Sequence, residues 1–164
     1  MKIAIDPAYD KDIAIAWSSD NKKIEYDLIK IPKAHLKKET RSFEEIAKAV
    51  TAYCDRNFDL TKNTLIVIEG QWFGRSAKVF EQLINVRALI HGMIIAKYPN
   101  VTIEIVGPIT WQSKILDKKA NSEDTTKIRS IKKAFELTKQ TLTDDESDAV
   151  CMCKYAINYI NNEK

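Results

Sequence analysis

The segment Leu-Ile-Val-Ile-Glu at 65–69 limits the possible folds of this chain more than any other stretch. A continuous apolar run that ends in an acid and Gly70 is typical of a strand buried on both faces, with a site at its carboxyl end. Such a strand needs helices on both sides of its sheet. The sequence therefore predicts an α/β fold with Glu69 at the mouth of a site.

Strand-like patterns also fill the start of the chain and recur at 101–108. The runs 2–9 and 12–19 flank a short turn containing Asp and Pro, and the run 23–31 alternates in polarity before Pro32. These three runs predict an antiparallel meander.

Helical spacing of apolar residues indicates four helices, the first with Ser42 as N-cap and Glu45 at the capping-box position. The chain from Trp111 to about Thr126 is polar and lysine-rich, which favours a connection with a flexible loop at 121–124. We expect a mixed sheet of about five strands, the first three antiparallel, with helices on both faces in one domain, 1–164. The predicted helices are 42–58, 76–98, 126–140 and 146–160.

Composition excludes some classes of protein. No apolar run approaches the roughly 20 residues of a membrane span, and the early Asp6 is unlike a signal peptide. Three cysteines are an odd number at spacings that suit neither a disulfide framework nor a zinc site. We therefore expect a cytoplasmic protein without a membrane partner.

Acids stand at three places where a buried charge is costly. Asp6 ends the first strand, Glu69 ends the fourth, and Asp145 with Asp148 opens the last helix before an apolar run. Parallel neighbouring strands would place Asp6 and Glu69 at the same edge of the sheet, below the start of that helix. Asp145 and Asp148 are three positions apart and share a helix face.

This acid set favours a metal site. Carboxylates without convergent His or Cys suit Mg²⁺ or Mn²⁺, and two such ions can stabilise both reacting oxygens of a phosphodiester. The alternative is that Asp144, Asp145 and Glu146 merely favour the positive end of the helix dipole. That interpretation suits Asp144 and Glu146 best, although Asp144 is four positions from Asp148 and could replace Asp145 as a ligand.

The ordered motifs IDPAYDKDIAIAW, VIEGQWFG and DDESDAVCMCKYAI resemble the RuvC family of Holliday junction resolvases, in the RNase H-like superfamily. The resemblance spans nearly the whole chain. It implies that Asp6, Glu69, Asp145 and Asp148 are catalytic metal ligands for two Mg²⁺ ions per site, with Mn²⁺ as a substitute. It also implies a homodimer that presents two sites to a four-way junction.

Two positions depart from the family pattern. Ala8 stands where the family usually has glycine, and Gly70 follows Glu69 where the family more often has Gln. These departures look more like a bacteriophage resolvase, which would work in the host cytoplasm.

Candidate DNA contacts follow the fourth and fifth strands. The resemblance implies that Trp72 stacks on a base, whereas Phe73 suits a lid over the core. Residues 114–139 hold eight cations against four acids, which favours binding of a polyanion, although such a run also occurs on ordinary solvated helices. The candidate DNA-binding residues are Trp72, Arg75, Lys78, Lys114, Lys118, Lys119 and Lys127.

The acid set predicts a metal-dependent phosphodiester hydrolase, and the resemblance implies a crossover junction endodeoxyribonuclease acting in DNA recombination and repair. The alternatives are another RNase H-like nuclease, acting on RNA–DNA hybrids or flaps, and a junction-binding protein without catalysis. An actin-like nucleotide-binding fold is disfavoured because no glycine-rich phosphate loop follows the first strand pair. His35 and His91 are poor catalytic candidates, since one lies in a polar loop and the other among apolar helix residues.

Overall fold

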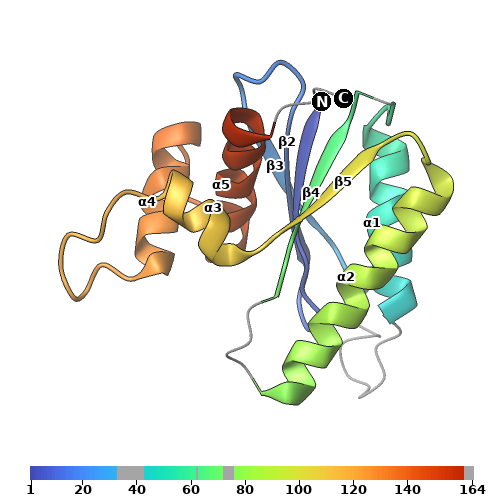
Figure 1. Ribbon diagram of the computed structural model, residues 1–164, viewed down its shortest axis with the longest axis horizontal. Helices are drawn as coiled ribbons and strands as arrows, with labels where there is room; N and C mark the ends of the chain where they lie inside the picture. The colour runs from blue at the N-terminus through green and yellow to red at the C-terminus, as the bar shows by residue number, and fades with distance from the viewer. Residues whose placement is uncertain (33–42, 62, 72–75, 161–164) are drawn as a thin grey trace.

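A computed structural model describes residues 1–32, 43–61, 63–71 and 76–160 of the chain. Its centre is a five-stranded sheet in the order β3-β2-β1-β4-β5 (Figure 1). The strands are β1 (Lys2–Asp6), β2 (Ile13–Ser18), β3 (Glu25–Ile29), β4 (Leu65–Glu69) and β5 (Thr102–Val106).

The meander and the parallel strands have the predicted arrangement. β2 is antiparallel to β1, with Lys2 opposite Ser18, and β3 is antiparallel to β2. β4 is parallel to β1, and β5 is parallel to β4. The prediction of a mixed α/β sheet whose first three strands are antiparallel is confirmed.

Helices cover both faces of this sheet. Figure 1 shows α1 and α2 on one side, and α3, α4 and α5 together on the other. The predicted N-cap of the first helix, Ser42, lies outside the described residues. The helices are α1 (Phe43–Asn57), α2 (Ala77–Lys97), α3 (Pro108–Ile115), α4 (Thr126–Thr138) and α5 (Asp144–Tyr159).

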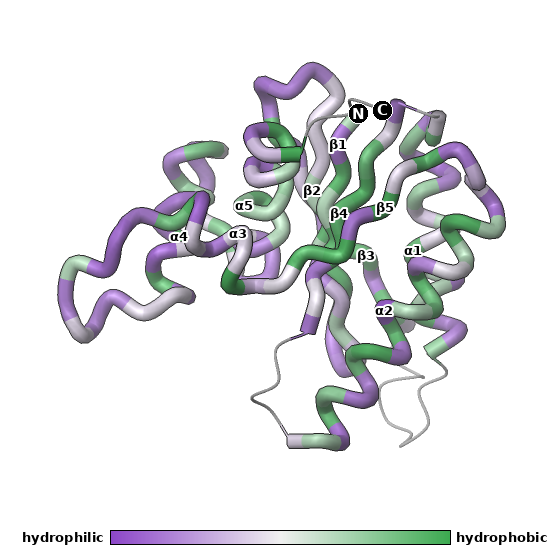
Figure 2. The backbone as a smooth tube through the Cα atoms, viewed as in Figure 1, coloured by the Kyte–Doolittle hydropathy of each residue, from purple (hydrophilic) through white to green (hydrophobic). Residues whose placement is uncertain are grey.

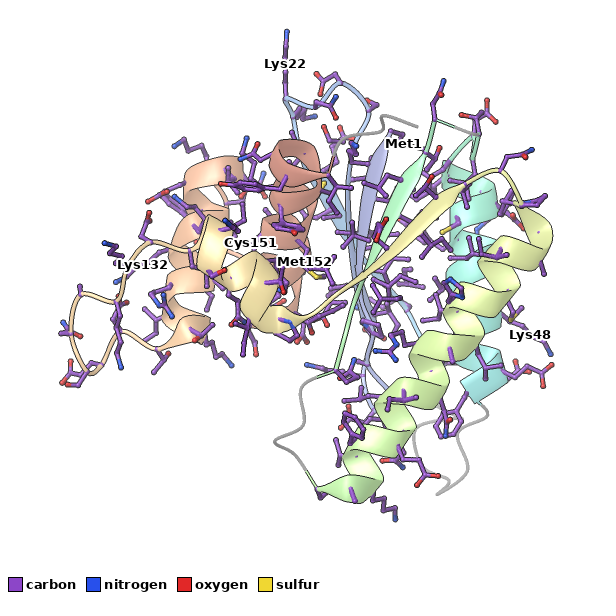
Figure 3. All side chains as sticks on the ribbon, viewed as in Figure 1. Met1, Lys22, Lys48, Lys132, Cys151 and Met152 are labelled. Carbon is purple, nitrogen blue, oxygen red and sulfur yellow. The ribbon has the colours of Figure 1, made fainter. Side chains whose placement is uncertain are left out.

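The two faces of β1 and β2 carry side chains of different size. Ile3 and Ile5 lie in the core beneath α1 and α2, whereas Ala4 and Ala16 lie in the core beneath α5. Successive strand residues point to opposite faces, so this alternation follows directly from the sequence. The small alanines let α5 approach closely, and Cys151 and Met152 of that helix, labelled in Figure 3, are completely buried.

The helix α3 corrects the prediction of a polar connection that starts at Trp111. Gly107 caps the helix, Pro108 stands in its first turn, and the buried Trp111 and Ile115 share one face. Proline at the first helical position followed by apolar residues four apart is a recognisable helix signal. The expected connection is therefore shortened, and it begins after α3.

The helix α2 is unusually apolar for its exposure. By length and composition it could cross a membrane, with a mean hydropathy of 1.3 over a stretch of which 22% is buried. One side of α2 packs on α1 and the sheet through Val86, Ile90 and Ile94, while Leu89 is 38% exposed. Figure 2 shows the apolar colour recurring along its length. Since a helix that packs against other protein can have the same composition, this feature is weak evidence for a membrane.

Candidate active site

Asp6 and Glu69 end neighbouring parallel strands. Ile5 pairs with Ile68 in the register of β1 and β4, so the two acids follow at the same edge of the sheet. Beyond Glu69 the backbone amide of Gly70 donates to the carbonyl of Val106 (2.8 Å), which ties the chain to the end of β5. The carboxyl end of the parallel strands is where open sheets usually carry their sites.

The start of α5 is fixed by a capping box. The Thr143 hydroxyl accepts from the amide of Glu146, and the Glu146 carboxylate accepts from the amide of Thr143 (3.0 Å). Glu146 therefore has the helix-start role expected of it. The cap fixes where the first turn begins, and it places Asp145 and Asp148 above the edge that holds Asp6.

One cleft of about 630 Å³ joins these elements. All four predicted ligands line it, and Asp144 lines it as well. Within the described part of the chain, the lining holds six acids and a single cation. The lining residues are Asp6, Pro7, Ala8, Tyr9, Asp10, Lys11, Glu69, Gln71, Ser76, Val79, Leu83, Pro108, Asp144, Asp145 and Asp148.

Ala8 does not strain the turn after Asp6. Among the described residues other than glycine, only Asn21 and Lys139 have positive φ angles. The backbone at Ala8 therefore has no need of the glycine that the family pattern usually has there.

Burial and mutual repulsion oppose the ionisation of two carboxylates of this cleft, those of Asp6 and Asp148. Burial raises the pKa of Asp6 well above its ordinary value, and the charges of Glu69, Asp148 and Asp145 raise it further. Burial also raises the pKa of Asp148 to about 6, against the opposing effect of its hydrogen bond from Ser130. A bound cation would favour the ionised forms that this repulsion opposes.

Three of the four carboxylates accept a hydrogen bond from a side chain that the sequence interpretation did not include. The Trp111 indole donates to Glu69 Oε1 (3.0 Å), and the Ser130 hydroxyl donates to Asp148 Oδ1. Lys11 Nζ lies 2.5 Å from Asp145 Oδ1, an ion pair at the cleft wall. Each partner comes from a different element: α3, α4 and the turn between β1 and β2.

Asp144 and Asp145 differ in their surroundings. Lys127 Nζ lies 2.7 Å from Asp144 Oδ2, and this hydrogen bond lowers the pKa of Asp144 despite partial burial. The charge of Asp145 raises the pKa of Asp6. Both acids line the cleft and both are paired with a lysine, so Asp145 stays the predicted ligand and Asp144 the alternative.

The chemistry of these donors suits a hard divalent cation. The cleft offers carboxylate oxygens and contains neither His nor Cys among its lining residues, which fits Mg²⁺ or Mn²⁺ better than zinc. Within the described ranges, however, no three such side chains stand as a group that could hold an ion. The carboxylates would therefore have to draw closer together to share an ion, and a carboxylate that accepts one hydrogen bond still has oxygen lone pairs for coordination.

The predicted DNA-binding residues are spread over the surface. Lys127 stands at the rim of the cleft through its pair with Asp144, and Lys78 is exposed in the first turn of α2. Lys114 lies over the ring of Tyr159, 5.8 Å from its centroid, roughly 20 Å along α5 from the acids. Lys118 and Lys119 are exposed after α3. Trp72 and Arg75, like Phe73 and His35, lie outside the described residues.

The residue most clearly missed by the sequence interpretation is Trp111. It is completely buried and directs its one polar atom at Glu69. A buried Trp usually finds a partner for its N–H, so a tryptophan close after a strand end is a usable signal. Lys11 could also have been found, because the turn of an antiparallel hairpin lies at the carboxyl end of its first strand.

We expect the Trp111→Phe substitution to lower the free energy of unfolding by about 2–4 kcal/mol, since it removes a hydrogen bond to a carboxylate and leaves a cavity. Urea unfolding of Trp111→Phe, Glu69→Leu and the double variant would separate the two effects, because leucine has no atom that can accept the indole N–H. The double-mutant cycle should give a coupling of about 1–2 kcal/mol between residues 111 and 69. Additive effects would contradict a hydrogen bond between them.

No family model matches this sequence, and no curated protein sequence matches it. Solved structures do match this chain. RuvC of Thermus thermophilus in complex with a Holliday junction substrate has a TM-score of 0.66 at 12% identity, over 96% of this chain and 93% of that one. This decides the fold. The chain has a RuvC-like fold.

Two further RuvC-type structures have the same arrangement. Another Thermus thermophilus RuvC structure has a TM-score of 0.63 at 13% identity, covering 94% of this chain and 93% of that one. The yeast mitochondrial Holliday junction resolvase Ydc2 has a TM-score of 0.62 at 11% identity, covering 95% of this chain and 77% of that one. Similarity at this identity is a similarity of fold, and it does not single out the bacteriophage subfamily.

Proposed function

We propose that this protein is a structure-selective endodeoxyribonuclease that binds and cleaves four-way DNA junctions and other branched DNA. One observation carries the proposal: four carboxylates from two adjacent strand ends and one helix start line a single cleft in a RuvC-like fold. A fold alone does not specify an activity, so the proposal depends on this arrangement of acids.

In this proposal Asp6, Glu69, Asp145 and Asp148 hold two divalent ions, Mg²⁺ or Mn²⁺. Bound there, these ions would supply positive charge to the attacking and leaving oxygens of the phosphodiester. The chain's own contribution is positional. Trp111 holds the Glu69 carboxylate, Ser130 holds that of Asp148, and the capped first turn of α5 fixes Asp145.

In this proposal DNA is held by cations spread over the surface around the cleft. Lys127 and Lys78 flank it from α4 and α2, and Lys114, Lys118 and Lys119 lie farther out, where the arms of a junction would extend. Trp72 and Arg75 complete the proposed set on the strength of their place after Glu69. Bacteriophage origin and action in the host cytoplasm remain predictions, motivated by Ala8 and Gly70.

The direct test is incubation of the protein with a synthetic four-way junction in Mg²⁺ or Mn²⁺, beside a flap duplex and an RNA–DNA hybrid of matched length. We expect preferential nicking of the junction near its crossover. Preferential cleavage of the hybrid or the flap would assign a different nuclease activity. Junction binding without nicking in either metal would indicate a binding protein and contradict the proposed catalysis.

We also propose that the protein acts as a homodimer, with α2 at the interface. The apolar residues of α2 that the core leaves uncovered, including Leu89, are the observation that supports this. A stable dimer buries about 1,200–2,000 Å² in total, and a helix of this length can supply the centre of such a surface. A four-way junction has two strands to cut, which suits two sites related by a two-fold axis.

Leu89→Lys is expected to convert the dimer into monomers, because a charged side chain at the centre of an apolar interface has no partner there. Sedimentation velocity at micromolar concentration measures the change. Ile128→Lys is the matched control, since Ile128 is 41% exposed on α4, in the opposite helix layer. A monomeric unmodified protein, or dissociation by both substitutions, would contradict this interface.

A further inference from the structure

Lys11 is the one cation among the described residues that line the acidic cleft. It belongs to the turn after β1, five positions beyond Asp6, and its Nζ lies 2.5 Å from Asp145 Oδ1. The pair is asymmetric, because the lysine side chain is 51% exposed whereas that of Asp145 is 24% exposed. A carboxylate that is fixed in the wall of the cleft is thus neutralised by a long side chain that reaches in from solvent.

The charge of Lys11 acts on more than one acid. Burial lowers the pKa of Lys11, but its hydrogen bond to Asp145 and the charges of Asp145, Asp6 and Asp144 outweigh burial and raise it. Lys11 in turn favours the ionised forms of Asp6 and Asp148. The ammonium thus stands within the cleft, against a carboxylate that a divalent ion would use as a ligand.

We infer that Lys11 is an exchangeable counter-ion, which neutralises Asp145 in the metal-free protein and is transferred to a DNA phosphate when a divalent ion takes its place. The inference rests on the proposed function. It assigns a role to a residue that contributes no oxygen ligand to the metal. A lysine–carboxylate pair whose lysine is half exposed is weak enough for a divalent ion to displace.

Charge balance explains why the transfer would be useful. An acidic cleft repels the phosphates it must bind, so a metal-free cleft with six acids and one paired lysine is a poor site for DNA. Binding of a divalent ion adds positive charge and releases the ammonium a few ångströms away. Metal binding and phosphate binding are then linked through one side chain.

The first test is Mn²⁺ binding to the free protein, without DNA, measured by calorimetry for the unmodified protein, Lys11→Met and Lys11→Arg. Lys11→Met should bind Mn²⁺ about 2-fold to 5-fold more tightly, because no ammonium competes for Asp145. Lys11→Arg keeps the charge and should stay near the unmodified affinity. Lys30→Met is the matched control, since Lys30 pairs with Asp12 (2.8 Å) outside the cleft.

The second test is the salt dependence of junction binding. With Ca²⁺ present, the logarithm of the association constant for the junction should fall more steeply with the logarithm of the salt concentration for the unmodified protein than for Lys11→Met. The two slopes should differ by about one, as expected for one additional phosphate contact. In EDTA the two slopes should agree. Equal slopes in Ca²⁺ would reject the transfer to phosphate.

The outcomes separate this inference from the proposed function. If the unmodified protein binds Mn²⁺ and nicks junctions while Lys11→Met has unchanged Mn²⁺ affinity, only the role of Lys11 is rejected. If the unmodified protein neither binds Mn²⁺ nor nicks any branched DNA, the proposed function fails and the inference fails with it.

Discussion

The Asp6→Asn substitution is expected to slow junction cleavage in Mg²⁺ by roughly 10²–10³-fold, the range found when a group that stabilises transition-state charge is removed. Asp6 is central to the acid cluster, since the charges of Glu69, Asp148 and Asp145 all raise its pKa. Asparagine keeps the shape of the side chain and loses its charge. Single-turnover cleavage of a labelled four-way junction measures the effect.

The same substitution should not weaken junction binding. Affinity measured by mobility shift in EDTA should be unchanged or higher for Asp6→Asn, because the cleft then repels phosphates less. Asp59→Asn is the matched control, an exposed acid after α1 that does not line the cleft, and it should cleave normally. Equal cleavage by the Asp6 variant and the control would contradict a catalytic role for the acid set.

The Asp148→Asn substitution is expected to stabilise the metal-free protein by about 1–3 kcal/mol at pH 8 while it impairs cleavage. The pKa of Asp148 in the folded protein is raised to about 6, above the roughly 3.9 of an unfolded chain. The folded state therefore holds this proton more tightly than the unfolded state. Stability that is present near pH 4 is lost as the pH rises through 6 and the buried carboxylate ionises.

Asparagine at this position cannot ionise, and its side-chain oxygen can still accept the hydrogen bond from Ser130. Urea unfolding in EDTA at pH 4 and pH 8 tests the expectation, with Asp59→Asn as the exposed control. The gain for Asp148→Asn should largely disappear at pH 4. A gain of equal size at both pH values would show that ionisation is not its cause.

The sheet and most of the helices could be predicted because their signals are local. The β-rich runs on either side of a short turn identified β1 and β2, and alternating polarity identified β3. The apolar run identified β4, and the acids at 6 and 69 follow from where β1 and β4 end. The parallel pairing of β1 and β4 then brings these two acids together. For this part of the site, sequence pattern and topology were sufficient.

The partners of the acids could not be predicted in the same way, because they come from segments distant in the sequence. The sequence pattern predicts a polar stretch from Trp111 onward, because it does not reveal the short helix α3. It therefore does not reveal that Trp111 lies on a buried face of that helix. Ser130 meets Asp148 only because α4 packs on α5. A pattern that describes one element carries no information about which neighbour that element will meet.

The parallel register of β1 and β4 determines which changes of chain length this site can tolerate. Asp6 and Glu69 meet because of the register between β1 and β4, and that register does not depend on the length of the chain that connects the two strands. Insertions in the intervening turns leave the two carboxylates together, whereas a one-residue deletion within β4 would turn every following side chain to the other face. Chains that share this site therefore need share neither spacing nor identity, and aligned strand ends are the property by which to recognise them.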